Sequence, residues 1–178
     1  MSTMPIRTYP DPVLGQPTIE IDNIDAKIAQ LAQVMLETMY LAPGVGLAAN
    51  QIGIQKKIFV YDKGDGPNVV INPVIVETSG TWTYEEGCLS VPDLHWDIVR
   101  PNKVHLQGLD LDGNTLDVEV DEYHGRIFQH ETDHLNGILL IERLSEEQKE
   151  ETKKELRRMR MAPPAQSHDG LHLLFGDE

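Results

Sequence analysis

The stretch from Gln129 to Gly137 constrains this chain more than any other, because it contains the pattern His-Glu-x-x-His. If the stretch is helical, His130 and His134 lie one turn apart on one face, where both imidazoles can reach one metal ion. Glu131 then lies beside that ion, where its carboxylate can accept a proton from metal-bound water. The pattern therefore predicts metal-dependent hydrolysis.

Two simpler explanations compete with a metal site. A random order of this composition, with 7 His in 178 residues, would produce the pattern roughly 0.02 times, so chance explains it poorly. In the other explanation both histidines are hydrogen-bonded core residues of an amphipathic helix. The motif alone leaves that alternative open.

The residues after the motif lack a third ligand. In metzincin proteases the pattern continues to a glycine and a third histidine. Here Gly137 occupies the glycine position, but Leu140 stands where the histidine would be. A catalytic zinc-type site needs three protein ligands and one open position, so the third ligand must come from elsewhere in the chain.

Length and charge limit the class of protein. A chain of 178 residues is expected to form one domain with a substantial core. The formal net charge of −14 argues against binding to nucleic acid or to anionic membranes, which requires a basic surface. The chain has no long apolar run and no apolar core of a signal peptide near its start. We therefore expect a cytoplasmic protein with no specific DNA binding and no membrane association.

Three helices are predicted. Apolar residues at helical spacing predict the first over about 25–40, with Asn23 or Asp25 as its cap. The second carries the His-Glu-x-x-His motif, with Asp121-Glu122 as its cap and Gly137 at its end. The third opens at Ser145 and stops before Pro163.

β-Branched and aromatic runs predict strands between these helices. The predicted strands cover residues 57–61, 69–76, 82–85, 103–109 and 115–120. The last two flank Asp112-Gly113-Asn114, which is a strong hairpin signal. Four prolines within residues 1–22 exclude a continuous helix there and favour an extended arm.

A run of small residues from Gly44 to Gly53 precedes the first predicted strand. Its first six residues fit a permissive dinucleotide-binding pattern, but that pattern follows a strand and opens a helix. Here a helix precedes the run and a strand follows it, so a loop that lines a substrate is the better interpretation. Gln51 can supply an amide donor in this loop, and a plain tight turn is the alternative.

Cys88, the only cysteine, is the natural source of the third ligand. A thiolate binds borderline-soft divalent metals strongly, and Gly87 permits an unusual backbone path beside it. A single thiol can equally be a small buried apolar residue, and spacing does not decide between the two. No intramolecular disulfide can form.

Three separated motifs together resemble the peptide deformylase family. Gly-x-Gly-x-Ala-Ala-x-Gln matches residues 44–51, Glu-Gly-Cys-Leu-Ser matches residues 86–90, and His-Glu-x-Asp-His-Leu matches residues 130–135. The motifs occur in the family's order, and the similarity spans about residues 5–160. The joint occurrence of all three is highly specific.

This resemblance implies a role for each candidate residue. Cys88, His130 and His134 are expected to bind one divalent metal ion, ferrous iron in family members, with zinc or nickel as alternatives. Glu131 is expected to act as the general acid and base. Gln51 and the backbone N–H of Leu89 are expected to hold the formyl oxygen.

The resemblance also implies the substrate. The enzyme is expected to remove the formyl group from N-formylmethionyl peptides and nascent chains, to release formate, and to contact the ribosome. The methionine side chain is expected to enter an apolar pocket near His130. Val45, Gly46, Leu89 and Ile127 are the residues assigned to that pocket.

The expected fold is α+β, with antiparallel sheets packed around the central helix that carries the His-Glu-x-x-His motif. We expect one catalytic domain over residues 1–160 and a flexible C-terminal tail over residues 161–178. Two features depart from the family pattern: the segment 93–96 lacks an arginine that many members carry, and the acidic tail has no counterpart.

Two other functions compete with deformylation. A zinc endopeptidase would cleave internal peptide bonds and would need a third His or Glu ligand, for which Glu155 is a candidate by position only. A regulatory metal-binding protein would keep the fold without turnover. The intact Glu131 argues against a site that has lost catalysis.

Overall fold

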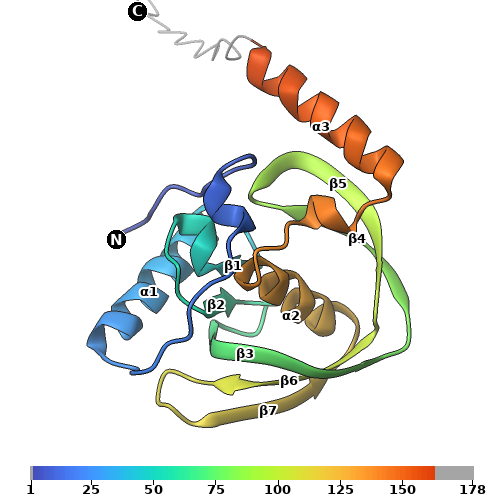
Figure 1. The fold of residues 1–178 in the computed structure, drawn as a ribbon. Coiled ribbons are helices and arrows are strands. Elements are labelled where there is room, and N and C mark those ends of the chain that lie inside the picture. Colours follow the sequence, from blue (N-terminus) through green and yellow to red (C-terminus); the bar gives the residue numbers. More distant parts are fainter. Residues whose placement is uncertain (1, 163–178) are drawn as a thin grey trace, which may run out of the picture. The chain divides into compact units, whose positions relative to one another are not determined.

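The computed structural model describes residues 2–162 (Figure 1). Contacts within the chain group it into two compact units, Met1–Arg143 and Leu144–Glu178. Residues 163–178 of the predicted tail lie outside the described residues, so the division into a catalytic domain over 1–160 and a tail stays a prediction. No helix in the described range is both long and apolar enough to cross a membrane.

The second unit contains helix α3 (Glu146–Met161). The hydroxyl of Ser145 accepts a hydrogen bond from the Gln148 N–H at 3.2 Å, and the Gln148 side chain accepts one from the Ser145 N–H at 3.1 Å. This reciprocal cap begins the helix where the sequence predicts it.

The first unit contains two antiparallel sheets and two α-helices, which confirms the predicted α+β class. The larger sheet has the strand order β1-β2-β3-β6-β7. Its strands are Gly46–Ala48, Ile58–Tyr61, Asn68–Ser79, Lys103–Leu109 and Thr115–Val120. The smaller sheet is the hairpin of β4 (Trp82–Cys88) and β5 (Val91–Arg100). Short 3-10 turns occupy Pro12–Gly15, Ala49–Ile52 and Leu140–Arg143.

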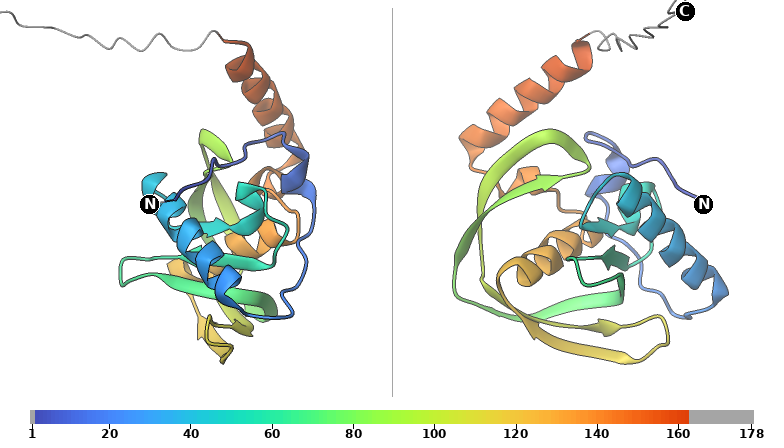
Figure 2. Two further views of the ribbon diagram at one scale, coloured as in Figure 1. Left: turned by 90° about the vertical axis from the view of Figure 1, so that its left-hand side faces the viewer. Right: turned by 180° about the vertical axis from the view of Figure 1, so that it is seen from behind.

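Helices α1 (Ala26–Leu41) and α2 (Glu122–Leu135) cover opposite faces of the larger sheet (Figure 2). Successive side chains of a strand point to opposite faces. In β2, Ile58 and Val60 join the core cluster that contains buried residues of α1, whereas Phe59 joins the cluster that contains Phe128 of α2. Because both faces of β2 are covered, all four of its residues are buried.

The two helices of this unit begin in different ways. Asp25 caps α1 as predicted, since its Oδ1 accepts hydrogen bonds from the N–H groups of Lys27 and Ile28 at 3.0 and 3.1 Å. Asp121 precedes α2, but its side chain makes no capping bond. Asn102 replaces it, because the Glu122 N–H donates to the Asn102 Oδ1 at 3.2 Å. Asp121 is the N-cap residue as predicted, and only the expected hydrogen bond from its side chain is missing.

The β4–β5 hairpin is the part of the fold that sequence analysis predicted least well. A short strand was predicted at 82–85, but β4 continues to Cys88, and the sequence did not predict β5. β5 carries Pro92 and Asp93, and Asp93 adopts a positive φ of 69°. Its mixture of charged and apolar residues hides the alternation that a strand normally shows.

Gly137 follows α2 with a φ of 76° and lies against another backbone segment. A Cβ at this position would be 2.8 Å from the Gly15 carbonyl oxygen and 2.9 Å from the Gln16 carbonyl carbon. Gly113 has a similar φ of 78°, but a Cβ there would meet nothing within 4 Å. An alanine at either position would pay the cost of a left-handed backbone conformation, but only an alanine at position 137 would also clash with neighbouring atoms.

We expect Gly137→Ala to lower the free energy of unfolding by clearly more than Gly113→Ala. The second substitution should lose only the roughly 1–2 kcal/mol that a left-handed conformation costs an L-residue. Urea unfolding of both variants measures the difference. Equal losses would show that the contact between Gly137 and residues 15–16 does not restrict side-chain size.

Candidate active site

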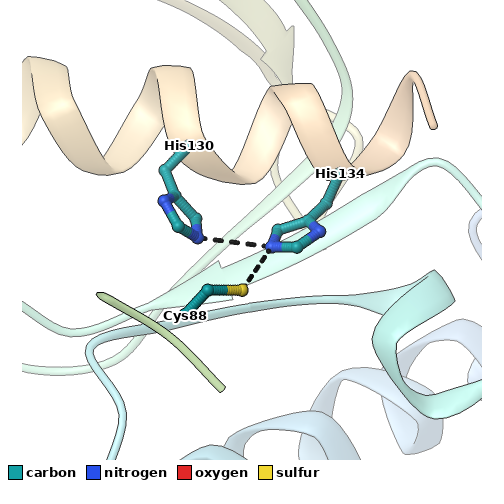
Figure 3. Close-up of side chains that lie close together, drawn as sticks. All are labelled: Cys88, His130 and His134. Carbon is teal, nitrogen blue, oxygen red and sulfur yellow. Dashed lines mark hydrogen bonds between the residues drawn. The ribbon is translucent and has the colours of Figure 1, made fainter. Parts of the chain in front are cut away.

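Three side chains with metal-binding atoms converge from α2 and from the end of β4 (Figure 3). His130 and His134 lie one turn apart on α2, and their Nε2 atoms are 3.2 Å apart. Cys88 is the last residue of β4, and its Sγ lies 3.3 Å from the His134 Nε2. Each of the three residues offers one ligand atom, and these three atoms all lie within 4.8 Å of one another.

The charges of this cluster suit a metal ion. Burial raises the pKa of the Cys88 thiol, but the charge of His134 and hydrogen bonds to His130 and His134 outweigh burial and hold that pKa well below its usual range. The buried thiol therefore gives up its proton more readily than an ordinary cysteine does, and its sulfur faces two ring nitrogens. A thiolate with two imidazoles is a donor set that borderline-soft divalent metals accept. The residues present fit a single divalent ion.

A buried ion network lies behind His130. The Glu86 Oε1 lies 2.9 Å from the His130 Nδ1, and the Glu86 Oε2 accepts hydrogen bonds from Arg100 Nε and Arg126 Nη1, both at 2.8 Å. Arg100 also donates to Asp133 at 2.8 Å. Burial raises the pKa of Glu86, but hydrogen bonds from His130 and Arg100 and their charges lower it to about 2. The carboxylate is therefore ionised at neutral pH.

Sequence analysis assigned no role to Glu86, Arg100 or Arg126. Two spacings could have indicated two of them. Glu86 precedes Cys88 by two residues, which places both side chains on one face of a strand. Arg126 precedes His130 by four residues, which places both on one face of a helix. Arg100 lies on the unpredicted β5, so no comparable spacing points to it.

Glu131 is buried against the backbone of Gly46. A Cβ at position 46 would lie only 2.5 Å from the Glu131 Oε1, so a glycine is needed for this approach. The Glu131 Oε2 has no hydrogen-bond partner among the described residues. Burial raises the pKa of Glu131, and the neighbouring histidines offset this only in part. The carboxylate can therefore hold a proton more readily than an exposed glutamate can.

Gln51 approaches the cluster from the opposite side. Its Oε1 accepts a hydrogen bond from the Ala48 N–H at 2.9 Å, which fixes the orientation of the amide. Its Nε2 donates to the Ser90 Oγ at 3.1 Å and lies 3.9 Å from the Cys88 Sγ. A donor is thus directed into the space beside the candidate metal ligands.

A cavity of about 610 Å³ opens onto these groups, within the size range of small-molecule sites. Its walls include every residue that sequence analysis assigned to substrate or catalysis. These are Val45, Gly46, Gln51, Leu89, Ile127 and Glu131, together with the candidate ligands Cys88 and His130. His134 completes the set through its contacts with Cys88 and His130. The fold therefore brings all nine candidates to one site, while their individual roles stay predictions.

Comparisons with known proteins agree on one family. The family described as polypeptide deformylase matches residues 3–150. A peptide deformylase of Clostridium botulinum is 47% identical over 143 residues, which cover 80% of this chain and 97% of that protein. A peptide deformylase of Acidobacterium capsulatum is 41% identical and covers 91% of this chain and 98% of its own length.

A solved structure shows the same fold. The peptide deformylase from Ehrlichia chaffeensis in complex with actinonin superposes with a TM-score of 0.85 at 35% sequence identity. The match covers 91% of this chain and all of that one.

The low pKa of Glu86 predicts a specific loss of stability in acid. Its folded pKa of about 2 lies below its ordinary value of 4.5, so its ionised form stabilises the fold above that ordinary value. This contribution is lost as the pH falls toward the folded pKa. The stability advantage of the native chain over Glu86→Gln should therefore be largest above about pH 5 and shrink toward about pH 2.

Urea unfolding across this pH range measures that advantage. Glu85→Gln, which alters the exposed neighbouring residue, is the matched control and should follow the native pH dependence. A difference between the native chain and Glu86→Gln that does not change with pH would contradict the prediction.

Proposed function

The chain belongs to the polypeptide deformylase family, and on this basis we propose which of its residues bind the metal and which move the proton. As a member it is a metal-dependent amide hydrolase, which removes the formyl group from the N-terminal formylmethionine of newly synthesised proteins and releases formate. The family implies a single divalent metal ion. We propose that Cys88, His130 and His134 hold it.

The convergence of one thiolate and two imidazoles beside a buried carboxylate is the observation that carries this proposal. A divalent ion held there would acidify a water molecule and polarise the formyl carbonyl. Cys88, His130 and His134 would supply three protein ligands, and a catalytic metal held by three ligands would keep a position open for water or substrate.

Glu131 is the proposed proton carrier. Its buried carboxylate first accepts a proton from the attacking water, whose oxygen bonds to the formyl carbon. The bond from that carbon to the methionine nitrogen then breaks, and Glu131 returns the proton to the departing amine. The raised pKa of Glu131 suits both directions of transfer, because the group must accept a proton and then give it up.

Gln51 and the backbone N–H of Leu89 are the proposed donors to the formyl oxygen. Negative charge grows on this oxygen as the carbonyl carbon becomes tetrahedral, and fixed donors stabilise that charge. The bond from Ala48 to the Gln51 Oε1 leaves the Nε2 facing Cys88, where such an oxygen would lie. Catalysis needs the Nε2 to exchange its bond with Ser90 for one with substrate.

The methionine side chain is proposed to enter the cavity along Val45, Gly46, Leu89 and Ile127. The formyl group is at the extreme end of the peptide, and the catalytic groups are buried. The rest of the chain must therefore leave through the open side of the cavity. This arrangement accepts any continuation of the nascent chain that fits the opening.

Because the substrates are nascent chains, we also propose a cytoplasmic location and contact with the ribosome. The net charge of −14 disfavours direct attachment to RNA, most strongly at low salt where screening is weak, so contact should be brief. Co-sedimentation with translating ribosomes at physiological salt, where this repulsion is screened, tests the contact, and its absence there would contradict it.

Glu131→Gln should separate metal binding from catalysis. We expect this variant to retain its metal and to release formate from formyl-Met-Ala-Ser at least about 100-fold more slowly, because it can no longer transfer the proton. Cys88→Ala should instead lose metal, because a ligand is missing. Metal content and formate release are measured for both. Full turnover by metal-loaded Glu131→Gln would contradict the proposed proton transfer.

Ferrous iron is the metal that we propose for the native enzyme. Zinc binds such donor sets more tightly than ferrous iron does, so purification in air and trace zinc should favour zinc. We expect the apoprotein to release formate fastest after anaerobic loading with Fe²⁺, more slowly with Zn²⁺, and not at all with a chelator. Equal or faster turnover with Zn²⁺ would contradict the assignment of iron.

A further inference from the structure

Glu86 is a buried acid to which the proposed reaction gives no task. It is 5% exposed and is the first residue of the Glu-Gly-Cys-Leu-Ser motif, two residues before Cys88 on β4. Its exposed neighbour Glu85 pairs with Asp97 across the hairpin and points to the opposite face. The strand therefore directs one carboxylate to solvent and the next toward α2.

The Glu86 carboxylate is surrounded by donors from two elements. Arg100 of β5 reaches both oxygens, with Nε 2.8 Å from Oε2 and Nη2 3.1 Å from Oε1. Arg126 of α2 donates to Oε2 at 2.8 Å, and the His130 Nδ1 lies 2.9 Å from Oε1. Both arginines are almost fully buried. Two fixed guanidinium groups thus prevent the carboxylate from turning away from the imidazole.

This contact determines which nitrogen of His130 is free. Because guanidinium N–H groups donate to both Glu86 oxygens, the carboxylate acts as an acceptor toward His130, whose Nδ1 then carries the hydrogen. When the ring gives up its other proton to bind a metal ion, its lone pair lies on Nε2, which faces the His134 Nε2. The contact also holds the plane of the ring. Carboxylates in this position orient metal-bound histidines and increase their basicity.

The two histidines are held unequally. The His134 Nδ1 is buried without a hydrogen-bond partner among the described residues, and His134 is only 1% exposed. Packing fixes this ring, whereas a charged hydrogen bond fixes His130. A change at Glu86 should therefore release one ligand and leave the other in place.

We propose that Glu86, held by Arg100 and Arg126, is a positioning residue that presents the Nε2 of His130 to the metal. This proposal rests on the metal site proposed above. One strand then supplies both a ligand, Cys88, and the carboxylate that orients a ligand on α2.

The test compares metal affinity in Glu86→Gln, in the matched control Glu85→Gln and in the native chain. Each apoprotein is titrated with Zn²⁺ against a chromophoric chelator, and its urea unfolding is measured separately to establish that it is folded. We expect Glu86→Gln to bind Zn²⁺ about 10- to 100-fold more weakly, with Glu85→Gln equal to the native chain. Native affinity in folded Glu86→Gln would overturn the proposal, because a purely structural role would change only the unfolding.

Glu86→Asp covers the case in which the glutamine variant does not fold. It keeps a negative charge opposite both arginines but shortens the reach to His130 by one methylene. Weakened Zn²⁺ binding in this folded variant supports the proposal, and unchanged binding overturns it. Because the readout is metal affinity, a native chain that binds Zn²⁺ but releases no formate would defeat the proposed function without affecting this result.

Discussion

The geometry of the site depends on one buried carboxylate that joins two parts of the fold. Glu86 on β4 accepts hydrogen bonds from Arg100 on β5 and from Arg126 on α2, and its other contact is His130. The same contacts set the distance between the strand that carries Cys88 and the helix that carries both histidines. Buried ion pairs contribute little net stability once desolvation is counted, so their main effect here is to fix geometry.

Two glycines also shape the site, because they let side chains approach the backbone closely. Gly46 lets the backbone of β1 approach the Glu131 carboxylate, and Gly87 leaves room for the ring of His95 beside Cys88. A methyl group at either position would force a side chain to move. The Glu131 carboxylate is thus packed directly against backbone, which limits its freedom and excludes water from most of its surface. Such burial raises the pKa of the Glu131 carboxyl above its ordinary value, so the group holds a proton more readily.

Much of this arrangement could be predicted from the sequence, because local patterns determine local structure. Asp25 begins α1 and Gly137 ends α2 as their residue types require. The spacing of His130 and His134 fixes their relation once the segment is helical. Cys88 was different, since its residue type made it a candidate ligand but only the family resemblance assigned it to a site with residues more than forty positions away. Long-range proximity of this kind has no local signal.

The features that sequence analysis missed are also long-range. Asn102 caps α2 from a turn about twenty residues earlier, and strand β5 exists because it pairs with β4 despite its poor alternation. Arg100 reaches Glu86 only through that pairing. In each case a residue or strand distant in sequence supplies the hydrogen bond or the strand pairing that the local sequence does not predict. The ion network behind the candidate ligands was therefore visible only in three dimensions.

The most direct test of this account is the coordination of the bound metal. X-ray absorption by the zinc-loaded chain should show one sulfur at about 2.3 Å and two nitrogens at about 2.0–2.1 Å, with the remaining coordination from oxygen. The sulfur contribution should disappear in Cys88→Ser. A coordination shell without sulfur in the native chain, or one that Cys88→Ser leaves unchanged, would contradict the assignment of Cys88, His130 and His134 as the ligands.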